Sequence, residues 1–204
     1  MSGIAYSAAS ALIPAPKSVY HTARISISQA LGKKILRCVS MQIGDHLKSK
    51  MRPGRKYAVL GIGSTQRSDD AAGMYFIELL SGMVKRDDVL LVAGSTAPEN
   101  FTGVIRDFGP DVLFIVDAAH LGLLPGETRI VPASDIGGVS FSTHMLPLTV
   151  MLDYLQAELG CEVLFIGIQP ASTDYGFCMS DDVRKEAERL AEEFSSALEL
   201  SDIS

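Results

Sequence analysis

Short apolar runs alternate with amphipathic stretches along the chain from Tyr57 onward. Four of the runs are rich in β-branched residues and are bounded by Gly, Asp or Pro, a pattern typical of strands that are buried on both faces. The pattern predicts strands over Tyr57–Ile62, Val89–Val92, Val112–Val116 and Val163–Ile168.

Three other stretches place apolar residues at steps of three and four, which is the spacing of one face of a helix. We expect helices over Ala72–Val84, Leu148–Leu159 and Ser180–Leu198. Strands that alternate with helices favour a parallel sheet, because each crossover places a helix on one face of it. The chain therefore predicts an α/β fold: a single three-layer α/β/α domain with a mostly parallel, twisted sheet covered by helices on both faces.

The first 56 residues differ from the rest in charge. They hold ten Lys and Arg residues and one acidic residue, whereas the remainder holds eight basic and 23 acidic residues. This segment is also rich in Ser, which favours a flexible basic extension over a core element. We divide the chain into an N-terminal extension, 1–56, and a folded domain, 57–204. The extension could be a docking tail for an acidic partner, a transit-peptide-like segment, or translated sequence upstream of a true start at Met41 or Met51.

Composition limits the setting of the protein. A chain of 204 residues, 47% of them apolar, can bury one good core. Its three cysteines have no CxxC spacing, which argues against a disulfide framework or a zinc ribbon and favours a reducing compartment. No apolar run reaches the roughly 18 residues that a membrane-spanning helix needs. We expect a cytoplasmic protein without membrane insertion and without a nucleic-acid partner.

Candidate chemistry lies where the predicted strands end. Asp69 and Asp70 follow the first strand, Asp117 ends the third, and His144 stands just ahead of the helix opened by Pro147. Ligands of open α/β sheets bind beyond the carboxyl ends of the strands, so these side chains could converge. Two carboxylates and an imidazole suit zinc or nickel. Spacing alone leaves open that each residue is a helix cap, a turn residue or a structural side chain.

The segment GIGSTQRSDDAAG, Gly61 to Gly73, also invites comparison with phosphate-binding loops. A dinucleotide loop needs glycine at its sixth position, where Gln66 stands, and a P-loop needs a Gly-Lys-Ser/Thr ending that is absent. Two adjacent carboxylates would also repel a phosphate at the start of the following helix. A nucleotide-binding module is therefore the weaker alternative.

Six motifs occur in the order found in one known family. They are GIGSTQRSDDAAG, against a family pattern GxGNxxxGDDGxG, then GSTAPEN, IVDA, LPGE, STHMLPL and GIQP. On these motifs the chain from about Tyr57 to Leu198 resembles the hydrogenase maturation endopeptidases (HycI/HybD-like), above all the branch that serves the formate hydrogenlyase hydrogenase. The resemblance implies a phosphorylase/hydrolase-like fold and a hydrolase that acts on a peptide bond.

The resemblance also implies a substrate and a site. Such enzymes remove the C-terminal extension of a nickel-iron hydrogenase large-subunit precursor after nickel insertion. The positions of Asp70, Asp117 and His144 would bind the metal and carry catalysis, with Asp69 as a helix-start or supporting group. Nickel would be carried by the precursor, and zinc held by the protease is the alternative, so that both an aspartic-type and a metal-dependent endopeptidase stay open.

Further expectations concern substrate contacts and departures from the family pattern. Gly94, Ser95 and Gln169 are candidate substrate-binding residues, although Gln169 could equally cap its own turn. Ser68 and Ala71 stand where the family pattern has glycine, so a loop that needed a positive φ there would be strained. A non-cleaving chaperone of the same nickel-loaded precursor is the remaining alternative.

Overall fold

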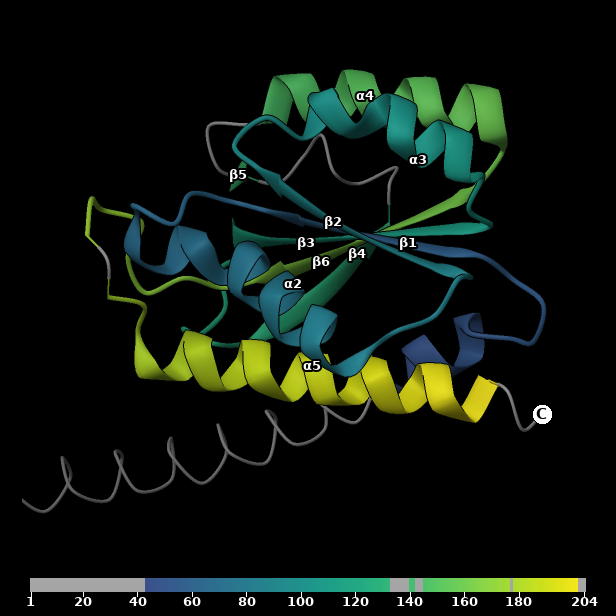
Figure 1. Ribbon diagram of the computed structural model, residues 1–204. Helices are drawn as coiled ribbons and strands as arrows, with labels where there is room; N and C mark the ends of the chain where they lie inside the picture. Colours follow the sequence, from purple (N-terminus) through teal and green to yellow (C-terminus); the bar gives the residue numbers. More distant parts are fainter. Residues whose placement is uncertain (1–42, 133–139, 142–144, 177, 202–204) are drawn as a thin grey trace, which may run out of the picture. The chain divides into compact units, whose positions relative to one another are not determined.

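A mixed, mostly parallel sheet forms the centre of the computed structural model (Figure 1), which describes residues 43–132, 140–141, 145–176 and 178–201. The strand order is β2-β1-β3-β6-β4, and β5 pairs with β3 off this path. The strands are β1 (Tyr57–Ile62), β2 (Val89–Ser95), β3 (Val112–His120), β4 (Thr128–Pro132), β5 (Ser140–Phe141) and β6 (Glu162–Ile168). β4 and β5 run antiparallel to their partners, whereas β2, β1, β3 and β6 run parallel to one another.

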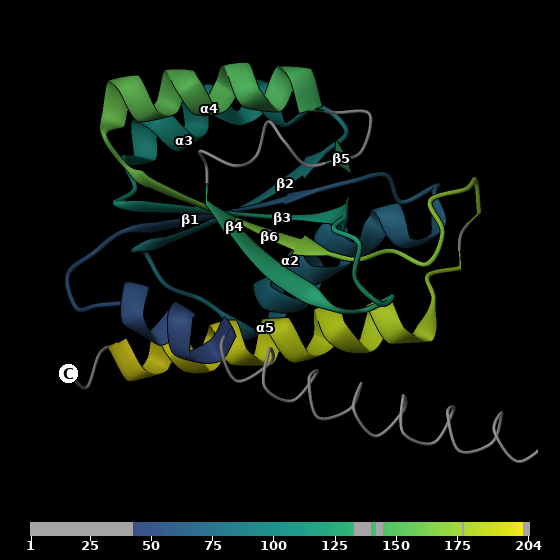
Figure 2. The ribbon, with the colours of Figure 1, turned by 180° about the vertical axis from the view of Figure 1, so that it is seen from behind.

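Helices cover both faces of this sheet. Figures 1 and 2 show α3 (Thr102–Phe108) and α4 (Met145–Leu159) on one face, and α2 (Ala72–Met83) and α5 (Asp181–Ser201) on the other. Each face buries its own apolar cluster, because alternate residues of the central strands point to opposite sides. The three-layer α/β/α fold and its mostly parallel sheet are confirmed.

The four predicted strands and three predicted helices are present with shifted ends. β2 and β3 continue beyond the apolar runs that predicted them, to Ser95 and His120. The sequence pattern did not predict β4, β5 or α3, nor the 3-10 helices η1 (Ser68–Ala71) and η2 (Pro98–Phe101). No helix within the described residues is long and apolar enough to cross a membrane.

Residues 43–56, which the sequence pattern assigned to the N-terminal extension, contribute to the core beside α2 and α5. Positions 43–50 are helical, and Ile43, Leu47 and Met51 are buried. Their spacing of four places them on one face of this short helix, which explains how a basic segment can pack on an apolar surface. The expectations for residues 1–42 lie outside the described residues.

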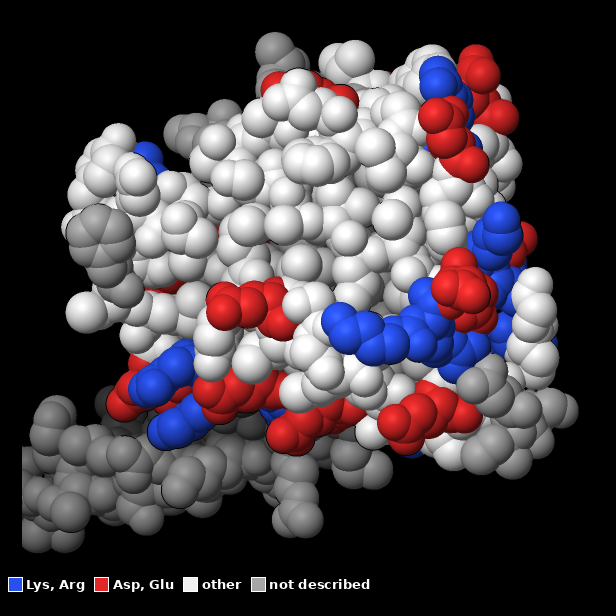
Figure 3. All heavy atoms as spheres, in the orientation of Figure 1, with Lys and Arg blue, Asp and Glu red and all other residues white. Residues whose placement is uncertain are grey.

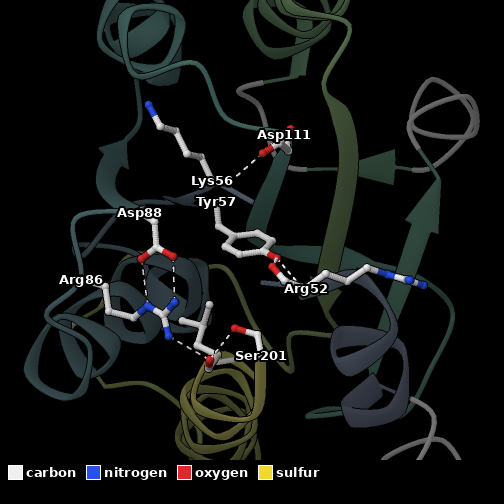
Figure 4. A network of polar contacts seen from close by, with 8 residues as sticks. Arg52, Lys56, Tyr57, Arg86, Asp88, Asp111 and Ser201 are labelled. Carbon is white, nitrogen blue, oxygen red and sulfur yellow. Dashed lines mark hydrogen bonds and ion pairs between the residues drawn. The ribbon is translucent and has the colours of Figure 1, made fainter. Parts of the chain in front are cut away.

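Polar contacts tie the amino ends of the strands together, at the opposite end of the sheet from the candidate site (Figure 4). The hydroxyl of Tyr57 accepts the N–H of Arg52 and donates to its carbonyl, and burial raises the pKa of this phenol. Arg86 donates to both carboxylate oxygens of Asp88 and to the carbonyl of Leu198 near the end of α5. These hydrogen bonds from Arg86 hold the pKa of the Asp88 carboxyl below its usual value.

Glycines bring α2 into direct contact with the sheet backbone. A Cβ at Gly73 would lie 2.2 Å from the carbonyl oxygen of Val116 and 2.3 Å from that of Ile62. A Cβ at Gly61 would lie 2.2 Å from the carbonyl oxygen of Gly73. The first turn of α2 therefore rests on the ends of β1 and β3, and no other side chain fits between them.

Gly73→Ala should lower the free energy of unfolding by about 1–3 kcal/mol, because the added methyl overpacks a site bounded by backbone. Gly82→Ala, in the same helix, is the matched control: a Cβ there meets nothing within 4 Å. The control should raise stability by up to about 1 kcal/mol through helix propensity. Urea unfolding of both variants tests this difference, and equal effects would contradict it.

Candidate active site

The turn after β1 delivers Asp70 to the carboxyl end of the sheet. Gly63, with φ 128°, turns the chain out of the strand, and η1 then carries the two acidic residues. Asp70 is only 2% exposed, and its Oδ2 accepts the N–H of Ser64 at 3.0 Å. This hydrogen bond fixes the carboxylate against the turn that it follows.

Asp117 lies in the neighbouring strand β3 and approaches the same turn. It is 1% exposed, and a Cβ at Gly63 would lie 3.6 Å from its Oδ1 and 1.8 Å from the carbonyl oxygen of Asp70. β1 has β2 on one side and β3 on the other, so the strand order reverses at this point. Ligands of open α/β sheets bind at such a reversal. Gly63 therefore lies beside both Asp70 and Asp117, and the convergence of their two carboxylates on a ligand stays a prediction.

The third expected ligand, His144, lies outside the described residues. The part of the chain that the structure describes contains no group of three His, Cys, Asp or Glu side chains placed to hold a metal. Asp70 and Asp117 are both buried at this turn, and carboxylate oxygens are ligands that divalent cations accept. A metal site at Asp70, Asp117 and His144 stays a prediction.

Asp69 has a different role from that of its neighbour. It is 1% exposed and accepts hydrogen bonds from Ala171 N, Ser172 N, Ser180 N and Ser180 Oγ at 2.6–3.2 Å. The last two bonds come from the residue that precedes α5. Asp69 thus joins η1 to the connection between β6 and α5, which agrees with its expected place as a supporting group.

The same geometry argues against a phosphate cradle. The N–H of Ser64, which a phosphate at this turn would need, is donated to the carboxylate of Asp70. Backbone atoms occupy the space where a side chain of either glycine would lie: those of Gly73 beside Gly61, and those of Ile62 and Val116 beside Gly73. The glycines of this segment therefore serve close packing of helix on strand.

Gly94 and Ser95 lie at the end of β2, where their environments differ. Gly94 is buried, and a Cβ there would lie 2.6 Å from Leu60 Cδ1, so its glycine is needed for packing of β2 on β1. Ser95 is exposed, has φ 53°, and directs its N–H to Met74 Sδ at 3.2 Å. Of the two, only Ser95 presents a side chain to the surface.

Gln169 is buried and its side chain is used within the fold. Its Oε1 accepts the N–H groups of Leu121 at 2.7 Å and Leu123 at 3.2 Å, and its Nε2 donates to the carbonyl of Pro170. Gln169 therefore holds the loop after β3 against the end of β6. This arrangement favours the interpretation that it fixes turns at the rim of the site.

Sequence reasoning did not single out two rim residues, Arg67 and Tyr175. The Arg67 guanidinium lies 5.1 Å from the centre of the Tyr175 ring, which is 81% exposed, and Arg67 Nε donates to Thr173 O. Both follow the carboxyl ends of strands, β1 and β6, so the rule that predicted the site could have found them. Exposed Tyr and Arg side chains are frequent anchors in protein interfaces.

Comparison with known proteins decides the family. A model described as hydrogenase maturation protease, HycI, matches residues 74–197. The chain belongs to this family. The fold described above is thus that of a hydrogenase maturation protease, a family of peptide-bond hydrolases.

Relatives of known structure or activity support this assignment. The hydrogenase 3 maturation protease of Escherichia coli K12 is 37% identical over 133 residues, which cover 65% of this chain and 84% of that protein. The crystal structure of the NiFe hydrogenase maturation protease HycI from Thermococcus kodakarensis is similar with a TM-score of 0.68 and 36% identity, covering 74% of this chain and 97% of that one. The maturating endopeptidase HybD from E. coli has a TM-score of 0.63 and 25% identity, covering 72% and 93%.

Asp69→Asn in this maturation protease should lower the free energy of unfolding by about 1–3 kcal/mol, because one amide nitrogen would face a donor inside the fold. Asp70→Asn should change stability less, since the Asp70 carboxylate accepts the N–H of Ser64 alone among the described backbone donors. Urea unfolding of the two variants measures this difference. A larger loss for Asp70→Asn would contradict the roles given to the two acids.

Ser68→Gly should raise the free energy of unfolding by up to about 1 kcal/mol. Ser68 has φ 40°, a conformation that costs a residue with a Cβ about 1–2 kcal/mol, and glycine returns about 0.5–1 kcal/mol as backbone entropy. Ala71→Gly is the matched control in the same turn, because Ala71 has φ −74° and gains nothing from glycine. Thermal and urea unfolding should show a higher free energy of unfolding for Ser68→Gly than for the wild type, and a lower one for Ala71→Gly.

Proposed function

We propose that this protein removes the C-terminal extension of a nickel-iron hydrogenase large-subunit precursor after nickel has been inserted. Asp70, Asp117 and His144 recognise the nickel that the precursor carries, so that an unfilled precursor is ignored. The observation that carries the proposal is the placement of two buried acidic residues, Asp70 and Asp117, beside Gly63 in a chain of the hydrogenase maturation protease family.

The proposed recognition follows from the charge of this site. Two carboxylates that the fold holds out of water favour a divalent cation over a neutral or anionic group. The hydrogen bond from Ser64 orients Asp70, and the backbone ladder of β3 orients Asp117 opposite Gly167. Neither side chain needs to reorganise when the precursor arrives, which favours binding of its metal.

Peptide hydrolysis requires an activated water, and two sources of activation are considered. In the first, the carboxylates hold the substrate's nickel and accept the proton of a water that attacks the scissile carbonyl. In the second, a zinc ion held by the same residues supplies Lewis-acid activation of water. The two versions differ in whether the purified protease needs a metal of its own.

The wild-type protein, freed of metal by a chelator, should cleave a nickel-loaded precursor and leave a nickel-free one intact, even with added zinc. Asp70→Asn and His144→Ala should each lower the cleavage rate by about 100-fold or more, because positioned acid–base and charge interactions are worth that much. Mass spectrometry of the precursor before and after incubation measures the removed tail.

Three other outcomes separate the alternatives. Cleavage of the nickel-free precursor only when zinc is added would show that zinc held by the enzyme, and not nickel carried by the substrate, is required. Binding of the nickel-loaded precursor without any change in its mass would indicate a non-cleaving chaperone. Full activity of Asp70→Asn, together with a free energy of unfolding equal to that of the wild type, would contradict the role proposed for Asp70.

A further inference from the structure

β2 is an edge strand of the sheet. Among the described strands it pairs with β1 alone, so its other side presents backbone N–H and C=O groups without a strand partner. Such an edge is a template for pairing with another extended chain, and proteins commonly protect it with charged side chains or proline. β2, with the sequence VLLVAGS, contains neither.

Much of the surface around this edge is uncharged. Figure 3 shows the face over β2, α2 and α3, where charged atoms gather toward α5 and the amino ends of the strands and an acidic patch lies over α2. Met83 in α2 and Val104 in α3 are exposed apolar side chains. A mostly uncharged surface favours an uncharged partner segment, because burial of an unpaired charge is costly.

A cavity of about 550 Å³ opens between β2 and α2. Leu91 and Ala93 line it from β2, and Met74 and Ile77 line it from α2. The two β2 residues are two positions apart and so point to the same face of the strand. The cavity can therefore take an apolar side chain from a strand that pairs with β2.

The cavity reaches the turn that carries candidate site residues. Ser68 and Ala71, which flank the two acidic residues of η1, also line it. β2 itself ends at Ser95, whose carbonyl accepts the N–H of Gly63, which lies beside the backbone carbonyl of Asp70 and beside Asp117 Oδ1. A chain paired with β2 would thus run toward the turn that carries Asp70.

From this arrangement we propose that β2 and the cavity, here called the β2 groove, bind the precursor segment next to the cleavage site as an added β-strand. The segment is an extended peptide with an apolar side chain in the cavity. Backbone hydrogen bonds to β2 supply affinity, and the cavity supplies specificity, as in other cases of strand addition. This inference rests on the proposed function, since it names how the same site holds its substrate.

Ala93→Lys tests the β2 groove, because it places a charge on the edge at an exposed position that lines the cavity. Val104→Lys is the matched control: it adds the same charge at a 52% exposed position of α3 that does not line the cavity. With the nickel-loaded precursor, Ala93→Lys should raise KM about tenfold with little change in kcat, whereas the control should resemble the wild type. Equal KM values for the two variants would overturn the inference and leave the proposed function standing.

Amide hydrogen exchange gives a second readout that does not need cleavage. In Asp70→Asn, a synthetic peptide spanning the cleavage site of the precursor should protect amides of Leu90–Ala93, because strand addition buries the exposed edge. Binding without that protection would overturn the inference. Protection that rises with protein concentration in the absence of peptide would also overturn it, since the occupant would then be a second copy of this chain. If the wild type fails to cleave any precursor, the proposed function fails, and this exchange experiment still decides the β2 groove.

Discussion

The buried carboxylate of Asp69 joins segments that lie more than a hundred positions apart in the chain, and the geometry of the candidate site depends on it. It accepts hydrogen bonds from Ala171, Ser172 and Ser180, which hold the connection from β6 to α5 against η1. Asp70 is the next residue, so the hydrogen bonds of Asp69 also fix the position of the Asp70 backbone. The two adjacent acids therefore differ in role: Asp69 accepts four hydrogen bonds from the fold, whereas Asp70 accepts the N–H of Ser64 beside Gly63.

The two ends of the sheet differ in what they contribute. At the amino ends, Arg86 joins Asp88 to the end of α5 through hydrogen bonds of ordinary length (Figure 4). At the carboxyl ends, Ser68 and Ser95 both have positive φ without being glycine. Strained residues of this kind persist only where the surroundings over-determine them, and they gather at functional sites. The amino ends of the strands thus contribute hydrogen bonds that join elements of the fold, whereas the carboxyl ends contain the strained residues expected near a functional site.

The central strands and the long helices could be predicted from sequence because their signals are strong. β1 and β3 are continuous apolar runs that the sheet buries on both faces, and α5 carries a regular apolar stripe. β4 gives no such signal, since it is a five-residue edge strand that ends in proline. α3 is equally hard to find, because its seven residues include a glycine and so make a short, weakly periodic helix.

The site could be predicted in part. The rule that ligands meet beyond strand ends selected Asp70 and Asp117, which are both buried beside Gly63 at that end of the sheet, and their binding of a metal stays a prediction. Sequence could not show that Leu60 leaves no room for a side chain at Gly94, or that Gln169 accepts hydrogen bonds from the loop after β3. Both features depend on neighbours distant in the chain. The helix over positions 43–50 was missed for the same reason: its apolar face becomes apparent only against α5.

The end of β1 explains why the acidic turn lies close to the end of β2. The register between β1 and β2 shifts between Gly61 and Ile62, so that Ile62 lies opposite Ser95 rather than Gly94. Irregularities of this kind bend a strand and redirect its side chains, and they are common beside active sites. Here the shift coincides with the positive φ of Ser95 and with the turn at Gly63. The sheet edge therefore changes direction where Asp70 enters, which places the end of β2 and the acidic turn side by side.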